Sequence, residues 1–182
     1  IASLEYLTEW VQWCKDRDII ACSDEAYSEI YFGEPPHSAL EVSTEGVLVF
    51  NSLSKRSAMT GYRVGWVAGD PQLIAEYRKL KANIDTGTPW FIQDAAIMAY
   101  SDETHVAEMR EEYRLRMQLF VEAFESAGLP RCESEASMYV WQKTPDGVSS
   151  GQLAEALLDE KILAVTIPSE ALVGNPEAHG PD

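Results

Sequence analysis

The run GVLVF at residues 46–50 constrains the fold of this chain more than any other feature of its sequence. Its apolar residues are consecutive, whereas a strand with one solvated face alternates apolar and polar residues, so the run predicts a strand buried on both faces. Two further strands are predicted in DIIACSDE at residues 18–25 and in YRVGWVAGD at residues 62–70. Such strands, alternating with helices, predict an α/β layer whose sheet is covered on both faces.

Helical periodicity accounts for much of the remaining chain. Over residues 3–16, after the N-cap Ser3, one helical face carries Leu4, Leu7, Val11 and Cys14. Further helices are predicted at residues 71–84, 90–100 and about 103–127. Ser149 opens another helix, because Gln152 stands three positions later and completes a capping box. Short strands are predicted at residues 137–143 and 162–167.

The composition of the 182 residues excludes several classes of protein. A formal net charge of −16 argues against a nucleic-acid partner, since such binding needs clustered Lys and Arg. No apolar run approaches the roughly 18 residues of a membrane span, and the acidic start does not resemble a signal peptide. The three cysteines and three histidines are scattered, so neither a disulfide framework nor a metal site is expected. We therefore expect a cytoplasmic protein.

A single lysine, Lys55, lies directly after the predicted strand in the stretch NSLSKRS. A lysine at the mouth of a buried strand is either solvated or has its pKa lowered for a chemical purpose. A neutral amine at such a place can bond to the carbon of an aldehyde or ketone. Taken alone, an ordinary surface lysine is the simpler interpretation.

The neighbours of this lysine favour the chemical interpretation. Ser52 and Ser54 supply hydroxyls beside it, and Arg63 supplies a guanidinium suited to binding phosphate. Asp24 and Tyr27 follow the preceding strand with a carboxylate and a phenol. The carboxyl ends of parallel strands meet at one edge of a sheet, so these groups could face a single ligand. An amine, a phenol, a carboxylate and a phosphate clamp are the groups that pyridoxal 5'-phosphate requires.

The stretch SLSKRSAMTGYRVG at residues 52–65 resembles the lysine signature of the class I/II aminotransferases, the fold-type-I pyridoxal-phosphate enzymes. SDEAYSEIYF at residues 23–32 is similar to the strand that carries the cofactor-binding aspartate and tyrosine of that family. The resemblance implies an α/β fold in which residues 1–100 are the C-terminal portion of the cofactor-binding large domain. Residues 101–182 would form the interdomain helix and most of a smaller α+β domain.

The resemblance also implies the role of each residue. Lys55 would hold the aldehyde of pyridoxal 5'-phosphate and then transfer the substrate proton. Asp24 would keep the ring nitrogen protonated, and Tyr27 would donate to the phenolate oxygen. The phosphate would be bound by Ser52, Ser54 and Arg63. Amino acids and 2-oxo acids would be the substrates, and a homodimer with active sites at the subunit interface is expected.

Three features of the family are missing from this sequence. The Asn-Pro-x-Gly motif and the glycine-rich phosphate loop would precede residue 1. The carboxylate-binding arginine is missing from the altered stretch TIPSEALVGNPEAHGPD, and no arginine follows Arg131. Because the chain also begins with Ile1, we expect a piece of a longer protein that does not catalyse transamination alone.

The substrate is a finer expectation. The motifs most resemble the succinyldiaminopimelate aminotransferases of bacterial lysine biosynthesis, with glutamate as amino donor. Aspartate or broad-range aminotransferases are the alternative within the family. A pyridoxal-phosphate-binding transcription regulator and a catalytically inert fragment are the alternatives outside it, since fold does not fix function.

Overall fold

The computed structural model describes residues 1–132 and 134–160, which belong to two compact units. The first unit contains Ile1–Arg116 and Glu135–Met138, and the second contains Met117–Ser134 and the residues from Tyr139 onward. The two units divide within the long helix α5 (Thr104–Ser126). The assignment of residues 1–100 and 101–182 to a large and a small domain stays a prediction.

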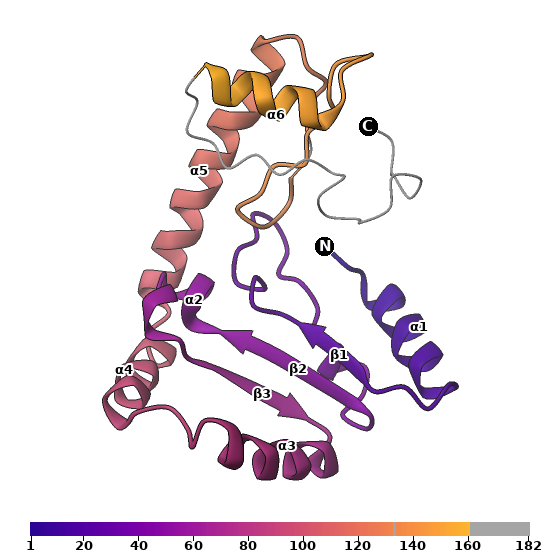
Figure 1. Cartoon of the computed structure of the whole chain (residues 1–182), viewed down its shortest axis with the longest axis vertical. Coiled ribbons are helices and arrows are strands. Elements are labelled where there is room, and N and C mark those ends of the chain that lie inside the picture. The colour runs from indigo at the N-terminus through magenta and orange to yellow at the C-terminus, as the bar shows by residue number, and fades with distance from the viewer. Residues whose placement is uncertain (133, 161–182) are drawn as a thin grey trace. The chain divides into compact units, whose positions relative to one another are not determined.

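The elements of the first unit follow one another along the chain in Figure 1. They are α1 (Leu4–Lys15), β1 (Ala21–Asp24), η1 (Ala39–Glu41), β2 (Val47–Ser52), α2 (Leu53–Arg56), η2 (Thr60–Tyr62), β3 (Gly65–Gly69), α3 (Pro71–Ile84), α4 (Trp90–Tyr100) and the start of α5. The second unit contains the rest of α5 and α6 (Ser150–Asp159). The mixed α/β class expected from the sequence is therefore confirmed.

Helix α1 buries Leu7, Val11 and Cys14 of the face that the sequence predicted, whereas Leu4 of that face is exposed. Ser3 is its N-cap and accepts a hydrogen bond from the backbone N–H of Tyr6 at 3.1 Å. Its buried residues Val11 and Cys14 join the core cluster, which also contains Ala21, Ala39, Val47 and Val49. Burial of this apolar face, more than helix propensity, holds a helix of this length in place.

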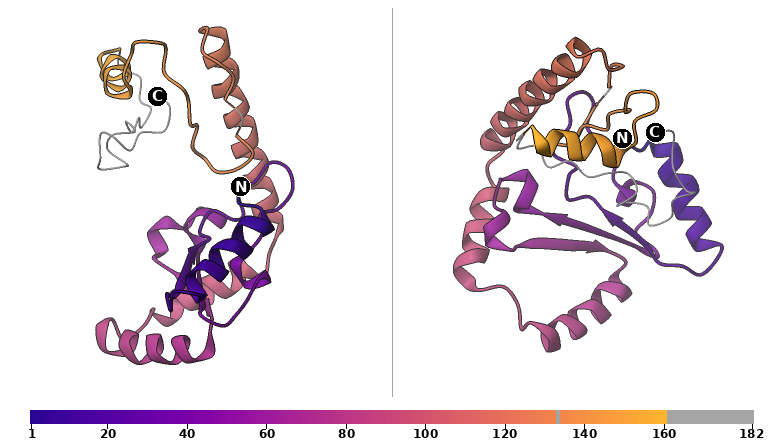
Figure 2. Two further views of the ribbon diagram at one scale, coloured as in Figure 1. Left: turned by 90° about the vertical axis from the view of Figure 1, so that its right-hand side faces the viewer. Right: turned by 45° about the horizontal axis from the view of Figure 1, so that its top comes forward.

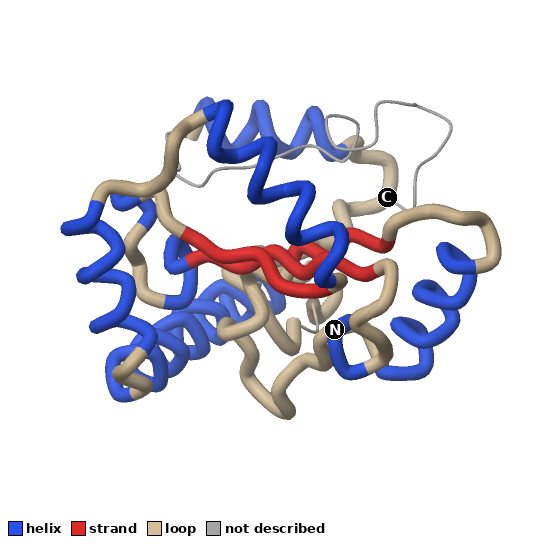
Figure 3. Tube along the Cα trace, turned by 90° about the horizontal axis from the view of Figure 1, so that it is seen from below, coloured by secondary structure: helices blue, strands red, loops and turns tan. Residues whose placement is uncertain are grey.

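The sheet has the order β1-β2-β3 (Figures 1 and 3). Strand β1 pairs with β2 in parallel, with Asp24 opposite Phe50, whereas β2 pairs with β3 antiparallel, with Ser52 opposite Gly65. Residues 47–49 of β2 are all buried, as the continuous apolar run predicted. Residues 50–52 of β2 are half-buried, and β1 and β3 both keep exposed residues, so the predicted covering of both faces holds for residues 47–49 of β2 and not for the whole sheet.

The antiparallel direction of β3 decides which residues meet at one end of the sheet. The ends of β1 and β2 lie at the same end as the start of β3, since the register pairs Ser52 with Gly65. Figure 2 (right) shows α2 at this end. A Cβ atom on Gly65 would come within 2.3 Å of the carbonyl oxygen of Asn51, so the close approach of the two strands here requires glycine. Arg63, which precedes β3, is thereby brought to the end of β2.

The predicted strand at residues 137–143 is wrong. In the described part of the chain this stretch has no strand, and the nearest pairing is an isolated bridge between Tyr31 and Ala136. Ser137 has a positive φ of 74° and donates its backbone N–H to the carbonyl of Ile30 at 2.7 Å. The left-handed conformation ends any extended run at this position. The other predicted strand, at residues 162–167, lies outside the described residues.

The helices predicted at residues 71–84, 90–100 and about 103–127 and after Ser149 are confirmed as α3, α4, α5 and α6. Asp70 caps α3 and Pro71 occupies its first turn, which are the residue types that begin helices. The capping box of α6 is present, because Ser149 Oγ accepts from the N–H of Gln152 and Gln152 Oε1 accepts from the N–H of Ser149. None of the helices in the described ranges is long and apolar enough to cross a membrane.

Asp102, which precedes α5, yields a prediction on pH. Its carboxylate accepts from the backbone N–H of Thr104 at 2.9 Å and lies 3.1 Å from His105 Nδ1. The hydrogen bond from the N–H of Thr104 is the main cause that lowers the pKa of Asp102 from 3.8 to about 2, and the imidazole of His105 is the second. A carboxylate whose pKa is lowered on folding stabilises the protein fully above its unfolded pKa, so this contribution is lost as pH falls from about 4 through about 2.

A carboxyl-carbon NMR titration would check this value, and Asp102 should titrate near pH 2. The variant Asp102→Asn should show a shallower loss of unfolding free energy between pH 4 and pH 2 than the parent protein. A midpoint at the usual aspartate value near 3.8 would contradict the role given to the contacts with Thr104 and His105.

Candidate active site

The short helix α2 presents Lys55 directly after β2. Ser52 ends β2 and caps α2, accepting from the backbone N–H of Ser54 at 3.1 Å. Leu53 is completely buried and anchors the start of the helix, while Lys55 is half-buried. A polar cap followed by one buried leucine thus turns the chain out of the sheet and leaves the lysine at the sheet end.

Tyr27 is the aromatic neighbour of Lys55. The Nζ atom of Lys55 lies 5.4 Å from the centroid of the Tyr27 ring. Lys55 makes no hydrogen bond or ion pair with another of the described residues, although the chain has many more acidic than basic side chains. The structure therefore brings these two sequence-predicted residues together and leaves the amine of Lys55 available to a ligand.

Ser52 and Ser54 form a pair of hydroxyls beside the lysine. Ser52 Oγ lies 2.9 Å from Ser54 Oγ and 3.1 Å from the carbonyl oxygen of Val64. The single hydroxyl hydrogen of Ser52 can serve only one of these acceptors at a time. The contact with Val64 ties the serine pair to the segment that carries Arg63.

Arg63 lies at the same end of the sheet in a strained conformation. Its φ of 54° and ψ of 48° are left-handed, a region that non-glycine residues seldom occupy. Its side chain is exposed and donates to the carbonyl of Thr60 at 2.9 Å. Within residues 1–132 and 134–160, Arg63 has no carboxylate partner, so its guanidinium can bind an anion.

Asp24 ends β1 opposite Phe50, and its side chain is exposed. Its Oδ1 atom accepts from the backbone N–H of Ala26 at 3.1 Å, and no contact joins it to Lys55. The next residue, Glu25, is occupied structurally, because its Oε1 accepts from Ser23, Ser38 and Ala39. Of these two adjacent carboxylates, Asp24 is thus the one that can serve a ligand.

Asn51 was not predicted from the sequence, yet it holds the site together. Its Nδ2 donates to the carbonyl of Glu25 at 3.0 Å and to Ser28 Oγ at 3.2 Å. Its Oδ1 accepts from the backbone N–H of Ser52 at 2.7 Å. One side chain therefore joins the segment of Asp24 and Tyr27 to the start of the segment that carries Lys55. An asparagine at a strand end was its only sequence signal.

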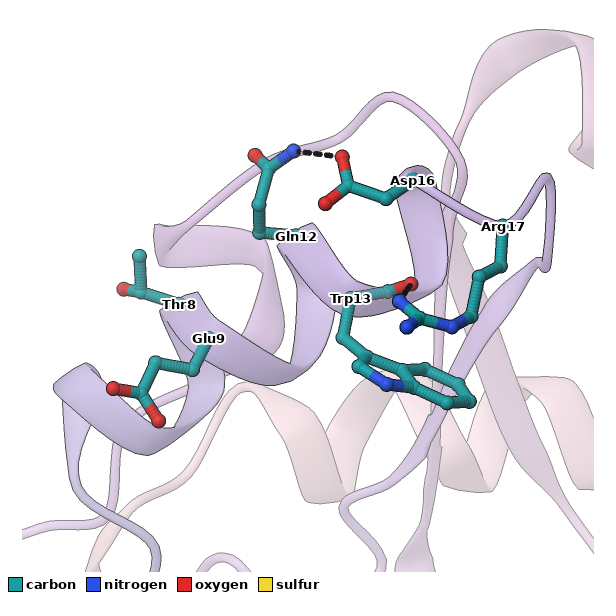
Figure 4. Close-up of a pocket in the computed structure, with 6 residues that line it drawn as sticks. All are labelled: Thr8, Glu9, Gln12, Trp13, Asp16 and Arg17. Carbon is teal, nitrogen blue, oxygen red and sulfur yellow. Dashed lines mark hydrogen bonds between the residues drawn. The ribbon is translucent and has the colours of Figure 1, made fainter.

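A hollow lies along α1 and the two residues that follow it. The hollow in Figure 4 is lined by Thr8, Glu9, Gln12, Trp13, Asp16 and Arg17. Gln12 donates to Asp16 at 2.7 Å, and the guanidinium of Arg17 lies 4.3 Å from the centroid of the Trp13 ring. Gln12 and Asp16 therefore satisfy each other, and Arg17 Nη1 also donates to the backbone carbonyl of Trp13 at 3.2 Å.

The set of donors at the sheet end fits pyridoxal 5'-phosphate chemically. An amine suits the aldehyde, a phenol suits the phenolate oxygen, a carboxylate suits the ring nitrogen, and two hydroxyls with a guanidinium suit the phosphate. The structure joins Lys55 to Tyr27 and Ser52 to Ser54, and places Arg63 and Asp24 at the same end of the sheet without direct contact to them.

Comparison with known proteins agrees with this chemistry. The family model for aminotransferase class I and II matches residues 1–177. The LL-diaminopimelate aminotransferase of Aquifex aeolicus is 39% identical over 168 residues, which are 90% of this chain and 43% of that protein. Other relatives at 36% identity carry the same name, without the succinyl group that the sequence led us to expect.

Solved structures give the same result. An aminotransferase from Neisseria meningitidis matches with a TM-score of 0.78 and 32% identity, over 85% of this chain and 41% of that one. The aminotransferase AspB from Helicobacter pylori matches with a TM-score of 0.77 and 32% identity, over 86% and 42%. The chain spans less than half the length of these relatives. It belongs to the class I and II aminotransferases, a family of fold-type-I enzymes that depend on pyridoxal 5'-phosphate.

Proposed function

We propose that the protein takes part in pyridoxal-phosphate-dependent transamination between an amino acid and a 2-oxo acid, with Lys55 as its catalytic residue. The environment of Lys55 is the observation that carries this proposal. Lys55 is half-buried, lies beside the Tyr27 ring and has no carboxylate partner among the described residues. Among the other described lysines, Lys15, Lys79 and Lys81 each pair with a carboxylate, and the exposed Lys143 does not.

In this proposal each side chain has one task. The amine of Lys55 would hold the cofactor at its aldehyde carbon and, when free, would carry the proton from the substrate α-carbon. Tyr27 donates to the phenolate oxygen, and Asp24 holds the proton on the ring nitrogen. Ser52, Ser54 and Arg63 would bind the phosphate, the serines through their hydroxyls and the arginine through its charged guanidinium. When bound, the cofactor supplies the electron sink for the substrate α-carbon.

The names of the relatives support a proposal on the substrate class. Those that we compared at 36–39% identity are named for LL-diaminopimelate, so we propose a diaminopimelate-type amino acid and a role in lysine biosynthesis. The succinylated form remains a finer variant of this proposal, with glutamate as the partner amino acid. A cytoplasmic homodimer also remains a prediction, which light scattering of the full-length protein would test.

A direct assay tests the proposal. The full-length protein, loaded with pyridoxal 5'-phosphate, would be given 2-oxoglutarate and one amino acid at a time, namely LL-diaminopimelate, its N-succinyl derivative or aspartate, and glutamate formation would be measured. Turnover with either diaminopimelate compound supports the proposal and identifies the form used. Turnover with aspartate alone would favour the aspartate alternative. No turnover with any amino acid would favour a regulator or an inert protein and overturn the proposal.

Arg63→Ala should weaken binding of pyridoxal 5'-phosphate by about 1–3 kcal/mol, because a hydrogen-bonded charge partner of the phosphate is lost. Equilibrium dialysis of the full-length apo protein would measure the change. Arg78→Ala is the matched control, since Arg78 is an exposed arginine on α3 and the same charge is removed. Equal affinities for the two variants would remove Arg63 from the phosphate site.

A further inference from the structure

The residue after the proposed catalytic lysine, Arg56, is a buried cation. Only 4% of its surface is exposed. Its Nη1 donates to the carbonyl of Ala99 at 2.9 Å, its Nη2 donates to the carboxylate of Glu103, and its guanidinium lies 5.1 Å from the centroid of the Tyr100 ring. A buried arginine is rare unless it is paired, so these contacts are the condition for its burial.

The partners of Arg56 connect it to the other side of the site as well. Its Nε lies 3.9 Å from Oε1 of Glu29, which follows Tyr27 by two positions. Glu29 is held in turn by Arg110, whose Nη2 lies 3.2 Å from Oε2 and whose Nε donates to the Glu29 carbonyl at 3.0 Å. The chain of ion pairs therefore runs from α5, through the segment that carries Tyr27, to α2.

The following residue, Ser57, is held by the same segment that holds Arg56. Its Oγ lies 2.9 Å from His105 Nε2, and His105 Nδ1 lies 3.1 Å from Asp102. Both residues that follow Lys55 thus contact the stretch 99–105, where α4 ends and α5 begins (Figure 1). Helix α2 itself has only four residues, fewer than a helix needs to be stable alone, so these contacts hold it in place.

We propose that Arg56 is a positioning residue that fixes the amine of Lys55 relative to Tyr27. This proposal rests on the proposed role of Lys55. The guanidinium holds the C-terminal end of α2 against residues 99–103 and against Glu29, while Ser52 and Leu53 hold its start. A lysine fixed at both ends of so short a helix reaches a bound aldehyde in one geometry, and such fixing is a source of rate.

Four variants of the full-length protein test this. Arg56→Met removes the charge and keeps much of the side-chain volume, and Arg56→Lys keeps the charge without the planar guanidinium that reaches several partners. Glu103→Gln weakens the ion pair with Arg56 at an exposed side chain. Arg116→Met is the control, because Arg116 is an exposed arginine of α5 that pairs with Glu112 at 2.8 Å. The rate at which borohydride traps pyridoxal phosphate on Lys55 would be measured from about pH 6 to about pH 10. The folded fraction of each variant would be measured in urea.

Because a misplacement of about 1 Å remote from the chemistry can cost on the order of 100-fold, Arg56→Met should lower the maximal labelling rate roughly 10–100-fold in folded protein. Arg56→Lys should recover part of this loss, Glu103→Gln should lose less, and Arg116→Met should match the parent protein. Noncovalent cofactor affinity, measured in a Lys55→Ala background, should not change with Arg56→Met, since the phosphate ligands are untouched.

A parental labelling rate in folded Arg56→Met would overturn the positioning role. The role would also be overturned if the midpoint of the labelling rate against pH moved while the maximal rate stayed parental, because such a shift reports only the lost charge. If Arg56→Met fails to fold, Arg56→Lys and Glu103→Gln decide: slower labelling supports the role and parental rates overturn it. A parent protein without selective label on Lys55 would instead refute the proposed function.

Discussion

Replacing Lys55 with alanine is expected to abolish transamination while the protein still binds pyridoxal 5'-phosphate noncovalently. Proton transfer by a positioned side chain contributes about 10²–10⁴-fold to a rate, and the Nζ atom of Lys55 lies 5.4 Å from the centroid of the Tyr27 ring. Stability should change little, because the contact of Lys55 with the ring contributes only about 0.5–1 kcal/mol. Glutamate formation by the full-length variant and cofactor binding in dialysis would be measured side by side.

Lys79→Ala is the matched control for this variant. Lys79 is exposed on α3 and pairs with Glu76 at 2.7 Å, so its loss removes the same charge without touching the sheet end. We expect Lys79→Ala to keep the activity of the parent protein. Turnover by Lys55→Ala at a rate comparable to this control would refute the assigned role.

The second large effect concerns Asp24. Asp24→Ala should lower kcat on the order of 10²–10³-fold, the loss typical when a preorganised electrostatic group is removed from an active site. Asp24→Glu should lose far less, because it retains a carboxylate that can hold the proton of the ring nitrogen. Steady-state kinetics of the full-length protein would give both values.

Two comparisons make the result on Asp24 specific. Asp146→Ala removes one negative charge from an exposed turn and should leave kcat unchanged. Thermal unfolding would show whether Asp24→Ala also loses the turn in which its carboxylate accepts from Ala26. Equal losses of kcat in the alanine and glutamate variants would count against the carboxylate's role.

Local signals were sufficient to predict most helices and all three strands of the sheet. Ser3, Asp70 and Ser149 are caps whose effect reaches only one turn, so a short sequence window contains the information. The strand predicted at residues 137–143 is absent because Ser137 takes a left-handed conformation and none of the described strands pairs with residues 138–143. Strand formation also requires a pairing partner, which local sequence does not specify.

Other features depend on contacts that are distant along the chain. The antiparallel direction of β3, which brings Arg63 to the end of β2, is set by pairing and not by the composition of the strand. An arginine is expected at the surface from its residue type, yet the partners of Arg56, Ala99 and Glu103, lie 43 and 47 positions later and make its burial possible. The amine, hydroxyls and phenol of the site were predictable because their chemistry is visible in the residues, whereas the network that holds them was not.

The central claim is that the sheet end around Lys55 is an organised cofactor site, and covalent mapping tests it most directly. The protein would be mixed with pyridoxal 5'-phosphate, reduced with borohydride and digested, and the labelled peptides would be identified by mass. We predict that the label is concentrated on the peptide containing Lys55 and is much reduced in Arg63→Ala. A label spread over several lysines, Lys79 and Lys81 among them, would contradict the claim.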